Sequence, residues 1–144
     1  MKPRTTARLY WTFTVLFCLM MLADGVAGLM LEKNGQEAMR QLGYPLYVMT
    51  ITGAAKILGA LALLQNKYHT LKEWAFAGFA IDFLGAAASV ALAGMGFVGT
   101  LPALVMTAVL FGIYFLWKQR YLAKYAASTD ETEAAFATPA AATL

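Results

Sequence analysis

The chain has 144 residues, of which 60% are apolar and only 13% are charged, and its mean hydropathy is +0.61. A soluble domain of this length usually carries about a quarter charged residues. The apolar residues are also gathered into long runs, so the composition excludes an ordinary soluble domain and indicates a single-domain integral membrane protein in a lipid bilayer. The net charge of +3 comes from basic residues beside these runs. Such placement is typical of membrane orientation signals, and we expect no nucleic-acid partner.

The chain begins with a basic leader at residues 1–8, which is followed by an apolar run over residues 9–31. A run of about 23 residues is longer than the apolar part of a signal peptide and can cross a hydrocarbon core of about 30 Å. We therefore interpret it as an uncleaved transmembrane helix. With three further runs, it predicts an all-α, transmembrane four-helix bundle within residues 9–125. The expected helices cover residues 9–31, 46–64, 74–92 and 101–117.

A short extracytoplasmic helix is expected at residues 35–42, between the first two apolar runs. Asn34 can cap its first turn, Glu37 follows three residues later, and Gly43 can close its C-terminal end.

The fourth run and the tail contain their own local signals. Pro102 is expected in the first turn of the fourth helix, where its missing N–H is harmless. Residues 126–144 are rich in Ala and Thr and include an acidic patch, which predicts a disordered tail.

Basic residues are distributed unequally between the two sides of the predicted bundle. Eight lie on the side of the termini and the second loop, whereas only Lys33 and Arg40 lie on the other side. By the positive-inside rule, both termini are predicted to be cytoplasmic. The eight basic residues are Lys2, Arg4, Arg8, Lys67, Lys72, Lys118, Arg120 and Lys124.

Three of the apolar runs contain a charged residue, namely Asp24, Lys56 and Asp82. A charge at the centre of a bilayer costs about 2.5–3.5 kcal/mol on insertion scales, so we expect these groups to be paired. Each lies beside small residues at helical spacing, and such stripes allow close helix packing in membranes. All three side chains are therefore predicted to face the bundle interior. The glycines of the stripes are Gly28 near Asp24, Gly53 and Gly59 near Lys56, and Gly78 and Gly85 near Asp82.

In the predicted spans, Asp82 lies closer in depth to Lys56 than Asp24 does, and this suggests how the three charges pair. A short loop joins the helices of Lys56 and Asp82, so we expect these two residues to form the direct pair, with Asp24 as a second partner or a separate site. One ammonium cannot neutralise two carboxylates, which favours a protonated carboxyl, a further donor or water. Two interpretations stay open: a ligand-binding or proton-holding site that includes Ser89, or a buried ion pair that only fixes helix register.

Other reactive groups are few. Cys18 is the single cysteine, so no intramolecular disulfide, redox pair or zinc cluster can form within the chain, and we expect no metal. No nucleophile triad, phosphate-binding loop or haem-ligating histidine pair occurs. Whether the chain is an enzyme stays open.

Four stretches of this chain, within about residues 8–120, resemble the DoxX-like family of small bacterial four-helix membrane proteins. Members often place a histidine after the serine of the third helix. Here Val90 follows Ser89, which argues against a function that needs an imidazole there. The four stretches are Leu42-Gly-Tyr-Pro-Leu-Tyr47, Ala55-Lys-Ile-Leu-Gly-Ala60, Leu71-Lys-Glu-Trp-Ala-Phe-Ala-Gly-Phe79 and Asp82-x-x-Gly85-Ala86.

The resemblance implies a place in the bacterial inner membrane and a redox-associated accessory role. The founding relatives are similar to a membrane subunit of thiosulfate:quinone oxidoreductase, which implies contact with a quinone or a similar lipophilic small molecule. Lys56 and Asp82 match the family pattern. In this interpretation Lys56 would donate to a carbonyl oxygen while Asp82 or Asp24 exchanges a proton.

Two other interpretations compete with this one. Some distant animal relatives look like assembly factors, which favours a membrane assembly or scaffold protein in which the charges only fix helix packing. Proton-coupled transport of a small solute is the third, although four helices leave little room for a pathway unless the chain forms a homodimer.

Overall fold

Five α-helices make up the computed structural model, which describes residues 3–137 of the chain and contains no strand within that range. Four of the helices are long and apolar enough to cross a membrane. The prediction of an all-α chain with four candidate spans is confirmed. The helices are α1 (Pro3–Leu29), α2 (Lys33–Gln41), α3 (Tyr47–Leu64), α4 (His69–Leu92) and α5 (Gly96–Ala137).

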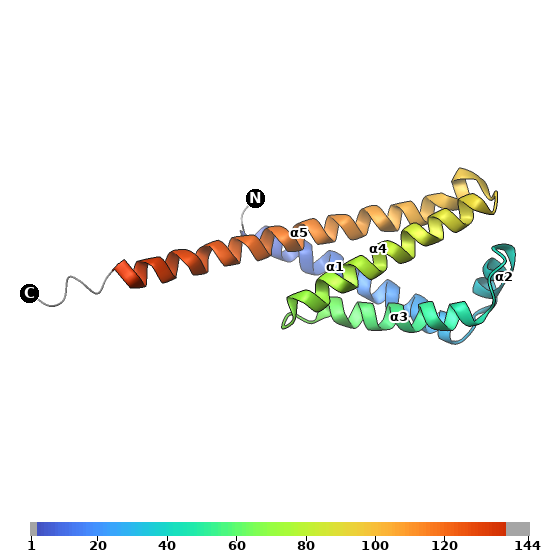
Figure 1. The fold of residues 1–144 in the computed structure, drawn as a ribbon, viewed down its shortest axis with the longest axis horizontal. Coiled ribbons are helices and arrows are strands. Elements are labelled where there is room, and N and C mark those ends of the chain that lie inside the picture. Colours follow the sequence, from blue (N-terminus) through green and yellow to red (C-terminus); the bar gives the residue numbers. More distant parts are fainter. Residues whose placement is uncertain (1–2, 138–144) are drawn as a thin grey trace, which may run out of the picture.

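The four long helices are arranged as two pairs, α1 with α3 and α4 with α5, and the pairs meet through α3–α4 and α1–α5 contacts. The beginning of α1, the α3–α4 loop and the far end of α5 point toward one end of the molecule (Figure 1). The short α2 and the α4–α5 turn lie at the other end.

Three phenylalanines join α1 to α4 at the centre of the molecule. The ring of Phe17 meets the rings of Phe79 and Phe83 edge to face, with centroids 5.3 and 6.1 Å apart, and the latter two rings stack at 5.9 Å. Each such aromatic pair stabilises the fold by about 0.5–1.5 kcal/mol beyond the contribution of the apolar area that it buries. All three side chains are buried.

Glycines allow α1 and α3 to pack backbone against backbone. A Cβ atom built on Gly53 would lie 2.7 Å from the carbonyl oxygen of Gly25 and 3.1 Å from the amide nitrogen of Leu29. Any larger residue would therefore force the two helices apart. This is the close contact that the small-residue stripes of the first two apolar runs predicted.

The ends of the long helices differ from those predicted. The basic leader is already helical from Pro3, and α4 begins at His69 rather than near residue 74. Proline is well suited to a first helical position, and no helix breaker separates His69 from the apolar run. Charged residues at the ends of these runs therefore continue the helix instead of forming a loop.

The helix α2 begins differently from the prediction. Its N-cap is Glu32, whose carboxylate accepts hydrogen bonds from the backbone N–H groups of Asn34 and Gly35 at 3.1 and 3.2 Å. The expectation that Asn34 caps the helix is wrong, because Glu32, two residues earlier, satisfies these free N–H groups. Gly43 follows the helix with a φ of +75°, as expected of a glycine that closes a C-terminal end.

The last helix is longer at both ends than expected. It begins at Gly96, so Pro102 lies beyond its first turn, and it continues through Ala137. Disorder was expected from residue 126, but alanine has the strongest helix propensity and nothing before Pro139 interrupts it. Residues 138–144 of the expected tail lie outside the described part of the chain. With 42 residues at about 1.5 Å each, α5 reaches about 63 Å, twice a hydrocarbon core.

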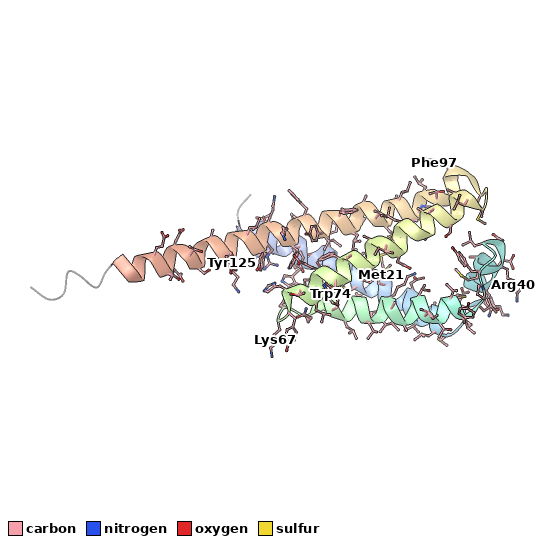
Figure 2. The ribbon with its side chains drawn as sticks, in the orientation of Figure 1. Met21, Arg40, Lys67, Trp74, Phe97 and Tyr125 are labelled. Atoms are coloured by element: carbon pink, nitrogen blue, oxygen red, sulfur yellow. The ribbon has the colours of Figure 1, made fainter. Side chains whose placement is uncertain are left out.

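The basic residues are separated by the fold as the positive-inside argument requires. Lys67 and Arg40 lie at opposite ends of the molecule (Figure 2). The side of the membrane on which each end lies stays a prediction from the charge count.

Replacing Gly53 with alanine should separate α1 from α3. We expect Gly53→Ala to lower the free energy of unfolding by about 1–3 kcal/mol, because the added methyl group overlaps the α1 backbone. Thermal unfolding in detergent measures the change. Gly112→Ala is the matched control, since no atom lies within 4 Å of its added Cβ. Equal stability of the two variants would contradict the close contact.

Candidate functional site

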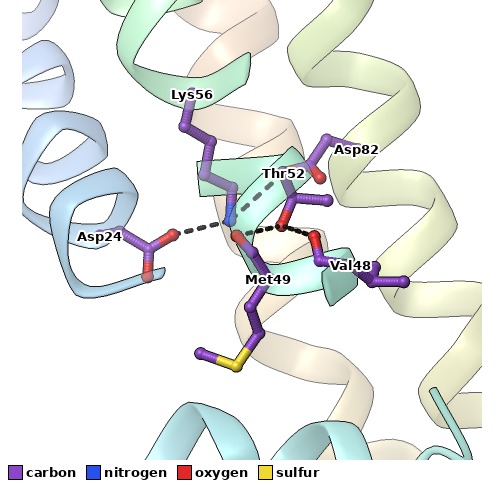
Figure 3. Close-up of polar contacts among 6 residues, drawn as sticks. All are labelled: Asp24, Val48, Met49, Thr52, Lys56 and Asp82. Atoms are coloured by element: carbon purple, nitrogen blue, oxygen red, sulfur yellow. Dashed lines mark hydrogen bonds and ion pairs between the residues drawn. The ribbon is translucent and has the colours of Figure 1, made fainter. Parts of the chain in front are cut away.

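Lys56 lies between two carboxylates that come from the helices on either side of α3. Its Nζ donates to Asp24 Oδ2 of α1 at 2.7 Å and lies 3.5 Å from Asp82 Oδ2 of α4 (Figure 3). The structure thus brings together the three charged residues that the apolar runs singled out. The expected order of the pairing is wrong, because Asp24 rather than Asp82 makes the shorter contact.

The distance between helix backbones explains this preference. Gly25 and Gly53 are in direct contact, and each lies within one turn of Asp24 or Lys56. A lysine side chain on α3 therefore reaches the short Asp24 side chain easily. The short loop between α3 and α4 favoured Asp82 as the partner of Lys56, but the close contact between the backbones of α1 and α3 brings Asp24 nearer.

The three charged side chains are only partly shielded. The exposed fractions of the side chains are 21% for Lys56, 27% for Asp82 and 55% for Asp24. Of the three side chains predicted to face the bundle interior, Asp24 is therefore the most exposed. Each carboxylate instead lines its own cavity, and Lys56 lines both.

We call the first cavity the groove. It lies between α3 and α4, has a volume of about 400 Å³, and is apolar apart from Thr52, Lys56 and Asp82. Its apolar walls are Ile51, Ala55, Leu58, Gly59, Ala62, Leu71, Trp74, Ala75, Gly78 and Phe79.

We call the second cavity the vestibule. It has a volume of about 380 Å³ and lies among the ends of α1 and α3 and the helix α2. Polar groups of Asp24, Glu32, Asn34 and Thr52 line it together with Lys56. Lys56 and Thr52 are the residues shared by the two cavities.

The hydroxyl of Thr52 is held by its own helix. Its Oγ1 donates toward the carbonyl oxygens of Val48 at 2.9 Å and Met49 at 3.3 Å (Figure 3). The hydroxyl proton is therefore occupied, and the lone pairs of Oγ1 are the part of this group available to a ligand or water. Its place beside Lys56 follows from i, i+4 spacing on α3.

Ser89 does not join the charged cluster, contrary to its inclusion in the expected site. Its Oγ donates to the carbonyl oxygen of Gly85 at 2.8 Å and lies 2.8 Å from the hydroxyl of Tyr44. Since the single proton of Ser89 is already donated, it accepts from Tyr44. Tyr44 stands between α2 and α3, so this bond connects that segment to α4. No local sequence pattern pairs Tyr44 with Ser89, because the two residues lie 45 positions apart.

The stripe of small residues on α4 does not pack as expected. No atom lies within 4 Å of the position that a Cβ would occupy on Gly78 or Gly85. On this helix the small residues leave space rather than fill it, and Gly78 forms part of the groove wall.

Lys72, which was expected in a loop, is buried. It is 2% exposed, and its Nζ donates to the hydroxyl of Tyr10 and the amide oxygen of Asn66, both at 3.1 Å. Among the residues whose side chains are described, no carboxylate lies within ion-pair distance of it. Its position in the first turn of α4, one turn before the apolar face of Phe76, is the signal that could have indicated burial.

The described part of the chain contains no group of three or more His, Cys, Asp or Glu residues that could hold a metal ion. Lys56 provides the site with an ammonium that donates hydrogen bonds, and Asp24 and Asp82 provide carboxylate oxygens that accept them.

The unequal distances predict unequal couplings. In double-mutant cycles, Lys56→Met and Asp24→Asn should show a coupling of about 1 kcal/mol or more in the free energy of unfolding, and Lys56→Met and Asp82→Asn a smaller one. Thermal unfolding of the single and double variants in detergent measures both couplings. A larger coupling with Asp82 would mean that the direct pair is the one first expected from the loop length.

A family model described as the DoxX-like family matches residues 12–113, which is more than two thirds of the chain. The match covers most of α1, which carries Asp24, and all of α2, α3 and α4, with Lys56 on α3 and Asp82 on α4. Comparisons with curated proteins and with solved structures gave no match. The chain, with its apolar membrane-crossing helices, therefore belongs to the DoxX-like family.

Proposed function

We propose that the chain binds a lipophilic molecule with a hydrogen-bond-accepting head, such as a quinone, in the groove between α3 and α4. The observation that carries the proposal is the composition of the groove: an apolar cavity of about 400 Å³ with Lys56 and Asp82 in its wall. Small-molecule sites commonly have this size and combine apolar walls with a few polar groups. In the inner membrane, such a protein would serve as a redox-associated accessory.

Lys56 has the donor capacity that this role needs. An ammonium has three N–H donors, and Asp24 at 2.7 Å occupies one of them. Asp82 at 3.5 Å is a longer contact that a carbonyl oxygen of the ligand could replace. Asp24 would keep the ammonium charged and oriented while another N–H group points into the groove.

The groove wall is open enough to admit a flat ring. Gly78 has no neighbour within 4 Å of a built Cβ, and Trp74 in the same wall is 73% exposed. Exposed apolar side chains on a membrane helix face lipid, so a lipophilic molecule could enter from the bilayer without crossing water. An aromatic wall also suits a planar ring, which can stack on it.

The charge distribution supports an orientation with both termini cytoplasmic. The end that carries Lys67 lies opposite the end that carries Arg40 (Figure 2). In this orientation α2 and the vestibule open to the extracytoplasmic side.

Filling the groove should abolish ligand binding without unfolding the protein. We expect Gly78→Phe to prevent binding of a short-chain ubiquinone, measured by quenching of tryptophan fluorescence, because the ring would occupy the groove. Gly112→Phe is the matched control, since its position is also free of neighbours within 4 Å. Lys56→Met should raise the dissociation constant about 10- to 100-fold, because the ligand would lose one hydrogen bond to a charged group. Lys67→Met should leave the dissociation constant unchanged. Unchanged binding in Gly78→Phe would refute the groove as the site.

A second function, an assembly or scaffold protein, is favoured by the direct Lys56–Asp24 contact. This ion pair lies beside the Gly25–Gly53 crossing and holds α1 on α3, which is what a purely structural pair would do. In this case the apolar helix faces would contact another membrane protein.

Gene deletion with complementation separates the two functions. If the chain is a scaffold, deletion should lower the abundance of at least one other membrane protein in quantitative proteomics, and Lys56→Met should restore that abundance as fully as the unaltered chain. If restoring the abundance of the other membrane protein requires Lys56, that abundance would instead depend on the ligand bound in the groove.

A further inference from the structure

The two cavities that meet at Lys56 differ in the solvent that suits them. The groove is apolar apart from three residues, whereas the vestibule contains two carboxylates and an amide, from Asp24, Glu32 and Asn34. A polar cavity of about 380 Å³ has room for several water molecules, each of which needs two to four polar partners. In the groove, Thr52, Lys56 and Asp82 are the polar partners that water could find, and the remaining wall is apolar.

We propose that the vestibule is the water-filled entrance through which water and protons from the α2 side reach Lys56, with Asp24 as the group that exchanges those protons. The pairing of a water entrance with a lipophilic ligand rests on the proposed function. The entrance itself depends only on the geometry of the vestibule.

Asp24 is the group in contact with both the vestibule and Lys56. Its side chain is 55% exposed, and its Oδ2 is 2.7 Å from Nζ of Lys56. Glu32 also lines the vestibule, but its carboxylate is occupied by the backbone N–H groups of Asn34 and Gly35 and by the Asn34 side chain. Both carboxylate oxygens of Glu32 are therefore held at the beginning of α2, whereas Asp24 contacts Lys56 through Oδ2, which leaves its Oδ1 for exchange.

The other titratable groups around Asp24 define what a proton would change. Glu32 lines the same cavity from the α1–α2 turn, Lys56 contacts Asp24 from α3, and Asp82 contacts Lys56 from α4. A proton taken from water by Asp24 forms a neutral carboxyl, which attracts the ammonium less strongly. Lys56 would then be left with Asp82, on the groove side, as its charged partner.

Cysteine labelling tests the water entrance directly, because Cys18 is the single cysteine and is buried. In a Cys18→Ala background, Ala27→Cys places a thiol in the vestibule, and Ala55→Cys places one in the groove beside Lys56. We expect a charged, membrane-impermeant thiol reagent to modify Ala27→Cys about tenfold or more faster than Ala55→Cys, because it reacts with thiolates in water. A lipid-permeant maleimide should modify both.

The side of entry is tested in sealed vesicles of both orientations. Gln41→Cys, exposed on α2, reports which vesicles present the α2 side to the reagent. Ala27→Cys should be labelled in the same vesicles as Gln41→Cys. If Ala27→Cys does not fold, Ala38→Cys offers a second vestibule position on α2. Equal reactivity of Ala55→Cys with the charged reagent, or no reactivity at the vestibule position where Gln41→Cys reacts, would overturn the proposal.

The role of Asp24 has its own readout. In vesicles that present the α2 side, the infrared carboxylate band that Asp24→Asn removes should follow the external pH, and a band that does not respond would overturn proton exchange at Asp24.

Labelling of Ala27→Cys should persist in the Gly78→Phe variant, whose groove is filled. Loss of ubiquinone binding together with intact labelling separates the two sites. If the unaltered protein does not bind ubiquinone, the proposed ligand is contradicted, whereas labelling of Ala27→Cys would still support the water entrance.

Discussion

The contact between Lys56 and Asp24 is the interaction on which the rest of this arrangement depends. A lysine in an apolar helix needs a compensating charge, and the nearest one is on the helix whose backbone touches its own. The glycines at the α1–α3 crossing make this possible, since larger residues would hold the two helices apart. Close packing and charge compensation therefore require each other at this point of the fold.

Lys56 also marks a boundary between two environments. On one side, the vestibule is lined by two carboxylates and an amide, and on the other side the groove is lined by apolar residues apart from Thr52, Asp82 and Lys56 itself. Two carboxylates and one ammonium leave a formal charge of −1, which is easier to hold where water reaches Asp24 than in a dry interior. The partial exposure of Asp24 is therefore consistent with the charge imbalance.

The role of small residues differs between the two sides of α3. Gly25 and Gly53 bring helices together, whereas Gly78 and Gly85 on α4 have open space beside them. Small residues at helical spacing beside Lys56 and beside Asp82 predicted close packing on both α3 and α4. Close packing depends on whether another helix lies against the stripe. Helix α4 contacts α1 through Phe79 and Phe83, whose rings meet Phe17, and not through Gly78 or Gly85.

The sequence by itself determined the helical class, the four candidate spans, the separation of basic residues to one end and the three charged residues of the site. These features follow from local composition and from the cost of placing polar groups in lipid. The tertiary structure alone decided that Asp24 is the closer partner of Lys56, that Ser89 bonds Tyr44 and that Lys72 is buried. Those contacts depend on distances between helices far apart in sequence, which are set by side-chain packing along whole helix faces rather than by any local pattern.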